Sequence, residues 1–190
     1  MKIWNRILKS VTYIVYFIEY KLFCFFIPLC LLITWSLSAA TLQVAIDGSQ
    51  AYTTIQSAID ASLNGDTVLV HPGRYFENVV LDSKIITLCS MEATTNDSTY
   101  IGSTTIDGNN SGSCVRFYNQ GQSGSTLRGL TIEHGTGYPF GAQSERHGGG
   151  LFVYTNSSVT VTNCIIKNNI STMGGGLFAF EASVTFRGVD

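Results

Sequence analysis

Residues 148–154 read GGGLFVY, and residues 174–180, which lie 26 positions further on, read GGGLFAF. Each copy is followed by a short alternating run rich in β-branched residues, SVTV at 158–161 and SVTF at 183–186. A repeat of this length with two short alternating runs per unit is typical of a β-solenoid, in which successive turns of the chain stack on one another. The sequence therefore predicts stacked parallel strands rather than a compact domain.

A second alignment predicts the corners of the solenoid. Residues 127–132 (LRGLTI) match 161–166 (VTNCII), and 186–189 (FRGV) begin the unit a third time. Residue types that accept a left-handed backbone recur in one column, where we expect a sharp corner in each turn: Gly129, Asn163 and Gly188.

The same alignment predicts which side chains face the core. The inward columns are Leu127/Val161/Phe186, Leu130/Cys164/Val189, Ile132/Ile166 and Val115/Leu151/Leu177. Strand alternation then places Thr131, Ile165, Glu133 and Lys167 outward. We interpret Glu133 and Lys167, on neighbouring turns, as a solvated surface pair.

The N-terminal segment differs from the rest of the chain. A basic start is followed by an apolar run at 22–37 and by small residues up to Ala40. This order is typical of a secretory signal peptide covering residues 1–40. The alternative is an uncleaved membrane anchor, although the uncharged run is shorter than the roughly 20 residues of a spanning helix.

Residues 41–66 are expected to form an N-terminal strand and a capping helix. The helix is predicted over 51–63, with a capping box of Thr53 and Gln56. Its apolar face would cover the open end of the core: Ile55, Ala58, Ile59 and Leu63.

Residues 67–190 are expected to form the β-helix coils, with early strands at 67–70, 75–81, 84–88, 103–106 and 113–117. The last coil stops in mid-strand without a polar cap, so the chain is expected to be the N-terminal part of a longer protein.

Charge and cysteine content limit the function. Residues 41–190 carry seven basic and twelve acidic side chains, a net charge of −5, and no basic stripe. This argues against nucleic-acid binding.

The odd number of cysteines, Cys89, Cys114 and Cys164, is compatible with buried small side chains or with one disulfide and a free thiol. Their spacing suggests no zinc site.

The opening of this region resembles a known superfamily. The motifs DGS (47–49), YTTIQSAI (52–59), GDTV (65–68), PGRY (72–75) and ENV (77–79) are similar to those that begin many pectin-lyase-like proteins, pectin methylesterases among them. The later GGGL units resemble repeats of large secreted bacterial β-helix proteins and, loosely, of polymorphic outer-membrane passengers. The resemblance implies an all-β fold, a right-handed parallel β-helix with a short N-terminal capping helix. It assigns no catalytic residue, because the QDT and Asp-Phe-hydrophobic-Phe-Gly segments of pectin methylesterases are absent.

The alignment also predicts a column of outward aromatic rings. If Leu151 and Leu177 face inward, the rings of five residues share one outer face: Phe152, Phe178, Tyr154, Phe180 and Tyr118. Such a strip could pack against sugar rings, or an insertion could cover it.

An insertion lies nearby. Eighteen residues separate Ile132 from Leu151, against ten between Ile166 and Leu177. The excess contains the candidate substrate-binding residues Glu133, His134, Tyr138, Glu145, Arg146 and His147. These side chains could serve acid–base chemistry or polysaccharide binding; equally, Tyr138, Pro139 and Phe140 could lie over the aromatic strip.

The DGNN turn at 107–110 could bind calcium, but we favour a plain turn and assign no metal ligand.

These patterns favour an exported, secreted or cell-surface β-helix module that interacts with a polysaccharide or cell-surface glycan. Any enzymatic activity would be that of a polysaccharide lyase or a glycoside hydrolase. The alternative is a non-catalytic adhesin-like or structural passenger. Nucleic acid is not expected as a partner, and a membrane is expected only through an uncleaved N-terminal segment. An enzyme should show acids and a basic residue converging beside the insertion, whereas a passenger should show columns of Asn, Ser and Thr.

Overall fold

The computed structural model describes residues 38–118, 124–141 and 145–190. The predicted signal peptide therefore lies almost entirely outside the described residues. Within them, no helix combines the length and apolar character that crossing a membrane would require.

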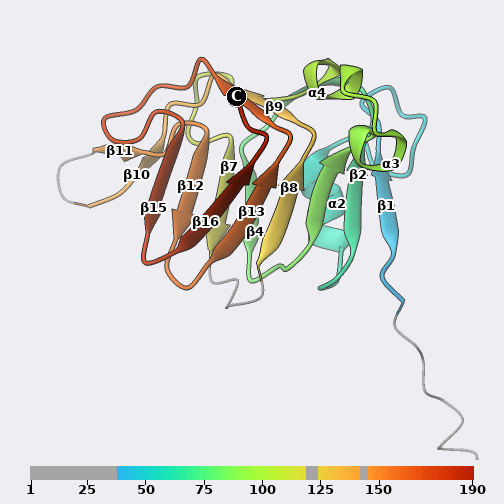
Figure 1. The fold of residues 1–190 in the computed structure, drawn as a ribbon, viewed down its shortest axis with the longest axis horizontal. Helices are drawn as coiled ribbons and strands as arrows, with labels where there is room; N and C mark the ends of the chain where they lie inside the picture. The colour runs from blue at the N-terminus through green and yellow to red at the C-terminus, as the bar shows by residue number, and fades with distance from the viewer. Residues whose placement is uncertain (1–37, 119–123, 142–144) are drawn as a thin grey trace, which may run out of the picture. The chain divides into compact units, whose positions relative to one another are not determined.

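Three parallel sheets run along the molecule (Figure 1). The first sheet contains, in order, β1 (Thr41–Val44), β2 (Thr67–Val70), β5 (Thr87–Ser90), β8 (Ser125–Arg128), β13 (Ser158–Thr162) and β16 (Ser183–Arg187). The second contains β3 (Gly73–Phe76), β6 (Thr104–Asp107), β9 (Thr131–Glu133) and β14 (Ile165–Lys167). The third contains β4 (Val79–Asp82), β7 (Val115–Tyr118), β12 (Leu151–Tyr154) and β15 (Leu177–Phe180). From β2 onward, strands of the first, second and third sheets follow one another along the chain, so the fold is a parallel β-helix, as predicted. The only interruption among the described strands is in the insertion, where β10 (Tyr138–Pro139) and β11 (Arg146–His147) pair with each other in an antiparallel hairpin.

The registers confirm the repeat. Leu151 pairs with Leu177 and with Val115, and Val161 pairs with Leu127 and Phe186. Aligned residues in the repeated units therefore lie directly over one another.

The predicted corner is also confirmed. Gly129, Asn163 and Gly188 have φ values of 71°, 49° and 55°, all in the left-handed region. Glycine and asparagine adopt this backbone at low cost, so the same bend recurs in each turn.

The predicted core columns are buried through most of the molecule. Leu127, Val161, Leu130 and Ile132 are fully buried. Phe186 has the predicted register but remains 44% exposed, because β16 is the edge strand of the first sheet.

Two residues that were predicted to point outward are nevertheless buried. Thr131 is 2% exposed, because α4 (Thr99–Ser103) packs over β9 and the hydroxyl of Thr131 donates to the carbonyl of Ile101 at 2.8 Å. Glu133 is 4% exposed, and its partners are described with the candidate site. Neither α4 nor the preceding α3 (Glu92–Thr95) was predicted from the sequence.

The N-terminal helix is shorter than predicted. Helix α2 spans Ile55–Ala61, and its N-cap is Thr54, so the prediction of a Thr53–Gln56 capping box is wrong. The carboxylate of Glu77 instead accepts hydrogen bonds from the backbone N–H groups of Ile55 and Gln56, at 2.8 and 2.9 Å.

The apolar face of α2 is buried through Ile55, Ala58 and Ile59, as predicted. Leu63 was expected on this face, but it follows the helix and is 54% exposed.

Two early strands have other bounds than the sequence predicted. The strand predicted over 75–81 is divided between β3 and β4, because the chain turns a corner at Glu77 and Asn78. The strand predicted over 84–88 begins only at Thr87.

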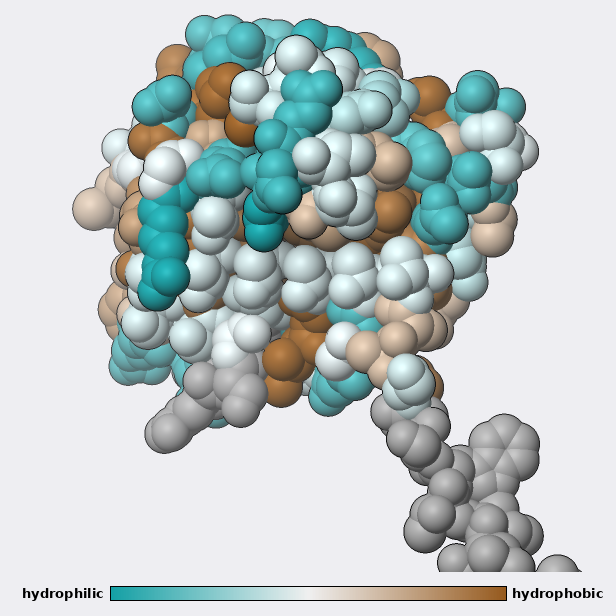
Figure 2. Space-filling model, turned by 45° about the vertical axis from the view of Figure 1, so that its right-hand side comes forward, coloured by the Kyte–Doolittle hydropathy of each residue, from teal (hydrophilic) through white to brown (hydrophobic). Residues whose placement is uncertain are grey.

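One register column on the outer face of the first sheet holds a threonine in each of the six strands. These residues pair in register from strand to strand: Thr41, Thr67, Thr87, Thr126, Thr160 and Thr185. Figure 2 shows this side of the molecule, where a pale band of weakly polar side chains crosses the surface. The face is therefore regular and uncharged along this column.

Candidate functional site

The insertion covers part of the predicted aromatic strip. Phe152 stacks on Phe178 with ring centroids 5.6 Å apart, and Tyr154 stacks on Phe180 at 5.7 Å. The ring of Phe140 contacts all four of these rings, with centroid distances between 5.0 and 5.8 Å. The strip is therefore covered at Phe152, which is fully buried, whereas Phe180 at its far end remains 42% exposed.

Tyr118 extends this aromatic cluster by one turn. Its ring centroid lies 6.0 Å from that of Tyr154 and 6.3 Å from that of Tyr138. Burial, followed by the hydrogen bond with Tyr138, raises the pKa of Tyr118 to about 12. Its hydroxyl therefore stays protonated at neutral pH.

Charged side chains gather on the outer face of the second sheet. We call this group the charged row, and its members are Arg74, Asp107, Glu133, His134 and Lys167. Asp107 pairs in register with Glu133, and Glu133 with Lys167, at the ends of β6, β9 and β14. Neighbouring parallel strands lie about 4.8 Å apart, so the two carboxylates are close without any loop having to bring them together.

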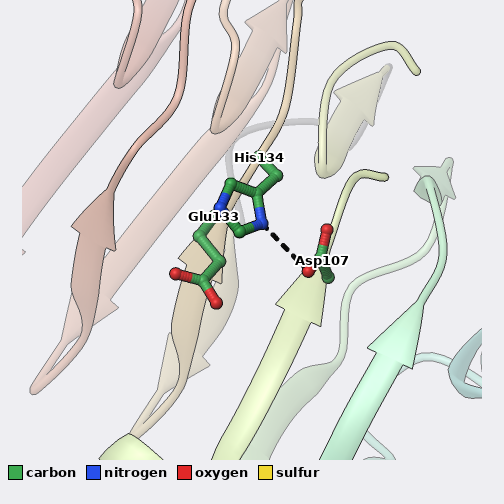
Figure 3. A group of neighbouring side chains, drawn as sticks. All are labelled: Asp107, Glu133 and His134. Atoms are coloured by element: carbon green, nitrogen blue, oxygen red, sulfur yellow. Dashed lines mark hydrogen bonds and ion pairs between the residues drawn. The ribbon is translucent and has the colours of Figure 1, made fainter. Parts of the chain in front are cut away.

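The backbone of His134 turns its ring toward the row. Consecutive residues of a strand normally point to opposite faces. His134 has a φ of 59°, and this left-handed bend lets its ring return to the side of Glu133 (Figure 3). Its Nδ1 atom lies 3.0 Å from Oδ2 of Asp107.

Arg74 bridges the two carboxylates. Its Nη1 atom bonds Oδ2 of Asp107, and its Nη2 atom lies 2.6 Å from Oε1 of Glu133. These hydrogen bonds raise the pKa of Arg74 above its usual value. The Nζ atom of Lys167 lies 3.7 Å from Oε2 of Glu133.

The carboxylates are much less accessible than their partners. The side chains of Asp107 and Glu133 are 4% and 5% exposed, whereas that of Arg74 is 46% exposed. The prediction of a solvated Glu133–Lys167 pair is therefore wrong in its environment, although the pairing itself is present. Burial alone would raise the pKa of Asp107, but hydrogen bonds from His134, the N–H of Asn109 and Arg74 lower it overall.

The DGNN segment forms a turn. Oδ1 of Asp107 accepts a hydrogen bond from the N–H of Asn109 at 2.8 Å, while Oδ2 faces Arg74 and His134. The acid of this turn thus belongs to the charged row. One atom from each of Asp107, Glu133 and His134 lies within 4.8 Å of the others, so these side chains could hold a cation or exchange protons with a ligand.

An open groove lies where the insertion meets the third sheet. Its volume is about 270 Å³. It is lined by Asn78, Ser111, Gly112, Ser113, Arg116, Tyr138, Pro139 and Arg146. The guanidinium carbon of Arg116 lies 4.5 Å from the ring centroid of Tyr138, which holds that cation in place.

Arg146 is fixed at the same groove. Its Nη1 atom donates to the carbonyl of Gly137 at 2.8 Å. The ion pairs formed by described residues use other cations, so no carboxylate in that part of the chain is paired with Arg116 or Arg146.

The predicted site residues of the insertion thus separate into three places. Glu133 and His134 join the charged row, and Tyr138 and Arg146 line the groove. His147 is buried, with its ring centroid 4.6 Å from that of Phe178 and its Nε2 atom 3.9 Å from the carboxylate of Glu145.

Sequence reasoning missed Arg74, Asn78 and Arg116 as site residues. It considered Asp107 only within a turn that could bind calcium, and it favoured a plain turn there. For Asp107 a signal was present, because Glu133 follows it by one repeat length of 26 residues.

The three sheets, their registers and the corner column define a parallel β-helix protein with a charged row and a cationic groove on its surface. No family model matches the sequence, and no curated protein matches it.

Among solved structures, the chain is similar to crystal structures of the pectin methylesterase from Aspergillus niger, in its deglycosylated and penultimately deglycosylated forms. Sequence identity is 21% in both, with TM-scores of 0.47 and 0.46. The matches cover 82% of this chain and 57% of those chains. The chain thus spans less than two thirds of the length of the structures it matches.

Proposed function

We propose that this protein is a polysaccharide-binding β-helix module that holds acidic sugar units in the groove between Arg116 and Arg146. The observation that carries the proposal is the placement of two guanidinium groups and the ring of Tyr138 around one open groove. Guanidinium groups match carboxylates in charge and geometry. The Tyr138 ring lies under the Arg116 guanidinium and so positions this cation at the groove before a ligand arrives.

The form of the groove favours one or two units of an extended chain. Its volume of about 270 Å³ is just below the roughly 300–1,000 Å³ of enclosed small-molecule sites. Side-chain and backbone groups of Asn78 and Ser111 supply neutral hydrogen-bonding partners for hydroxyl groups. Residues 41–190 carry a net charge of −5. Two arginines at one groove that pair with no carboxylate among the described residues are therefore a local exception that favours an anionic ligand.

The proposal is tested by calorimetric titration of the full chain with a hexuronic acid polymer and with a neutral glucan. We expect binding to the acidic polymer alone, weakened about tenfold by Arg116→Ala or Arg146→Ala through loss of a charged hydrogen bond. Arg187→Ala is the matched control, because Arg187 is exposed on β16 of the first sheet. Equal binding of both polymers, or no effect of either groove variant, would contradict the proposal.

A non-catalytic adhesin-like or structural passenger is the second candidate. The threonine column of the first sheet favours it, because columns of Asn, Ser and Thr were the feature expected of a passenger. The convergence of Arg74, Asp107 and Glu133 favours the enzymatic alternative. Prolonged incubation with the acidic polymer distinguishes them: chain shortening that Glu133→Gln abolishes indicates an enzyme, and binding without products indicates a passenger.

Export is part of the proposal. The basic start, apolar run and small residues before position 40 support a cleaved signal and a secreted or cell-surface location. N-terminal sequencing of the protein recovered outside the cell tests this. Retention of residues 1–40 in a membrane fraction would instead support an anchor.

A further inference from the structure

We propose that Asp107, Glu133 and His134 form a binding site for one divalent transition-metal ion of the Zn²⁺ or Co²⁺ type. One potential ligand atom from each residue lies within 4.8 Å of the others, and the three side chains meet at the ends of β6 and β9 (Figure 3). This inference is independent of polysaccharide binding, because none of the three residues lines the groove.

The backbone fixes the three potential ligands. The carbonyl of Glu133 accepts the N–H of Gly108 at 2.9 Å, and the carbonyl of His134 accepts the N–H of Asn110 at 2.8 Å. These two bonds join the turn after Asp107 to the end of β9. The ligands therefore converge through regular strand register and one left-handed residue, and binding would order no free loop.

The charged row combines buried carboxylates, Asp107 and Glu133, with partly exposed cations, Arg74 and Lys167. Asp107 and Glu133 are nearly inaccessible to water, so their charges need a partner inside the protein. Arg74 and Lys167 have side chains that are 46% and 53% exposed, so either cation can return to water at low cost. A divalent ion entering from solvent can take the place of Arg74, because the guanidinium lies against one oxygen of each carboxylate.

The ligand chemistry selects the class of ion. Calcium and magnesium prefer oxygen ligands, whereas zinc and related ions accept an imidazole nitrogen together with carboxylates. Nδ1 of His134 can act as a ligand when the ring proton resides on Nε2. Zinc–ligand bonds of about 2.0–2.2 Å require the three side chains to close by a small rotation, and a water would complete a four-coordinate site.

The proposal makes Arg74 a competitor of the metal. Removing its guanidinium frees both carboxylates and should tighten metal binding. The loss of a charged hydrogen bond to each carboxylate predicts a gain of about tenfold or more in affinity for Arg74→Met. A surface ion pair without a metal role would give no such gain.

The test uses the purified full chain with Zn²⁺ in calorimetry and Co²⁺ in visible absorption. We expect one ion per chain, with Co²⁺ absorption of a four- or five-coordinate site. His134→Ala and Glu133→Gln should each weaken binding about tenfold or more, by loss of one ligand. Ca²⁺ should not displace the bound Co²⁺.

His71→Ala is the matched control. His71 lies in another turn, with Nε2 2.9 Å from Oε1 of Gln43, and its loss should leave metal binding unchanged. Unfolding curves without metal verify that each variant is folded. Absence of binding in the wild-type chain overturns the proposal, even if Arg74→Met binds, because the guanidinium would then outcompete the ion. Binding that survives His134→Ala, or that disappears with His71→Ala, also overturns it.

Discussion

Gly135 and Gly149 approach each other so closely that a Cβ atom at position 135 would lie 1.8 Å from the carbonyl oxygen of Gly149. Gly149 belongs to the repeated GGGL unit, and its carbonyl accepts the N–H of Cys114 at 3.0 Å. Gly135 follows the charged row directly, and its N–H donates to Oδ1 of Asn169 at 2.8 Å. The repeated glycines thus allow three segments of backbone to pack at the corner between the charged row and the groove.

Gly135→Ala should therefore destabilise the fold strongly. The added methyl group meets backbone atoms rather than a flexible side chain, so the corner itself has to move. We expect a loss of about 3 kcal/mol in the free energy of unfolding, at the upper end for overpacking. Denaturant unfolding of the variant measures this loss.

Gly102→Ala provides the comparison. Gly102 lies in α4, and a Cβ atom there meets nothing within 4 Å. Alanine should change stability by no more than about 1 kcal/mol, in the stabilising direction. If the two variants behaved alike, the close approach at Gly135 would not limit the fold.

The repeat was sufficient to predict the architecture, because a β-helix places equivalent residues of successive turns over one another. Leu151 and Leu177 could be paired from the GGGL motif alone, and the corner column from Gly129 and Asn163. The early turns carry no such repeat. Consequently the corner at Glu77 and the helices α3 and α4, which interrupt the winding, were not predicted.

The site was less predictable for a physical reason. Arg74 contacts Asp107 on the next turn and Glu133 on the turn after that. Nothing in its local sequence indicates a contact with Asp107, which lies 33 residues further along the chain, or with the still more distant Glu133. The depth of burial of Glu133 also depends on this contact and on Lys167. Period-two alternation placed Glu133 on the outer face correctly, but outer-face position alone could not predict that its neighbours would cover it.

Phe140→Ala should uncover the aromatic cluster. Phe140 contacts Phe152, Tyr154, Phe178 and Phe180, and it is half-buried. Full burial of a phenylalanine would imply a cost of about 3–5 kcal/mol, so we expect about 2 kcal/mol here. Fluorescence of an apolar dye should increase for the folded variant.

Phe76→Ala controls for the loss of an aromatic side chain. Phe76 is 61% exposed on β3, so its removal should cost no more than about 0.5 kcal/mol and should not increase dye binding. An unchanged dye signal in Phe140→Ala would mean that the insertion does not shield the cluster in solution.

The ion pair of Glu92 with Arg128 should make the stability of the fold depend on pH. Hydrogen bonds from Arg128 and, less strongly, from Asn163 hold the pKa of Glu92 below its usual value. A carboxylate with a lowered folded-state pKa stabilises the fold above its unfolded-state pKa of about 4.3 and loses that contribution as pH falls through the folded value. The wild-type chain should therefore unfold at lower urea concentration at about pH 3 than at pH 7.

Arg128→Met should reduce the difference in stability between pH 3 and pH 7, because Glu92 loses its principal hydrogen-bond donor. It should also destabilise the chain at neutral pH by about 2 kcal/mol. Arg187→Met is the comparison, because Arg187 occupies the same outward column two strands away. Equal pH dependence in the wild-type chain and in Arg128→Met would remove Glu92 from the explanation.

The three described cysteines should be unreactive in the folded chain. Cys89, Cys114 and Cys164 are free and buried, and burial raises the pKa of Cys114 to about 12 and those of Cys89 and Cys164 to about 11. The thiolate is the reactive form, so almost none is present at neutral pH. A chain with Cys24→Ser and Cys30→Ser isolates the three thiols for titration with an aromatic disulfide reagent. We expect no rapid reaction before denaturation and the reaction of three equivalents of thiol after it. Rapid labelling of the folded chain would show that a thiol is accessible. A single equivalent after unfolding would show that a disulfide has formed.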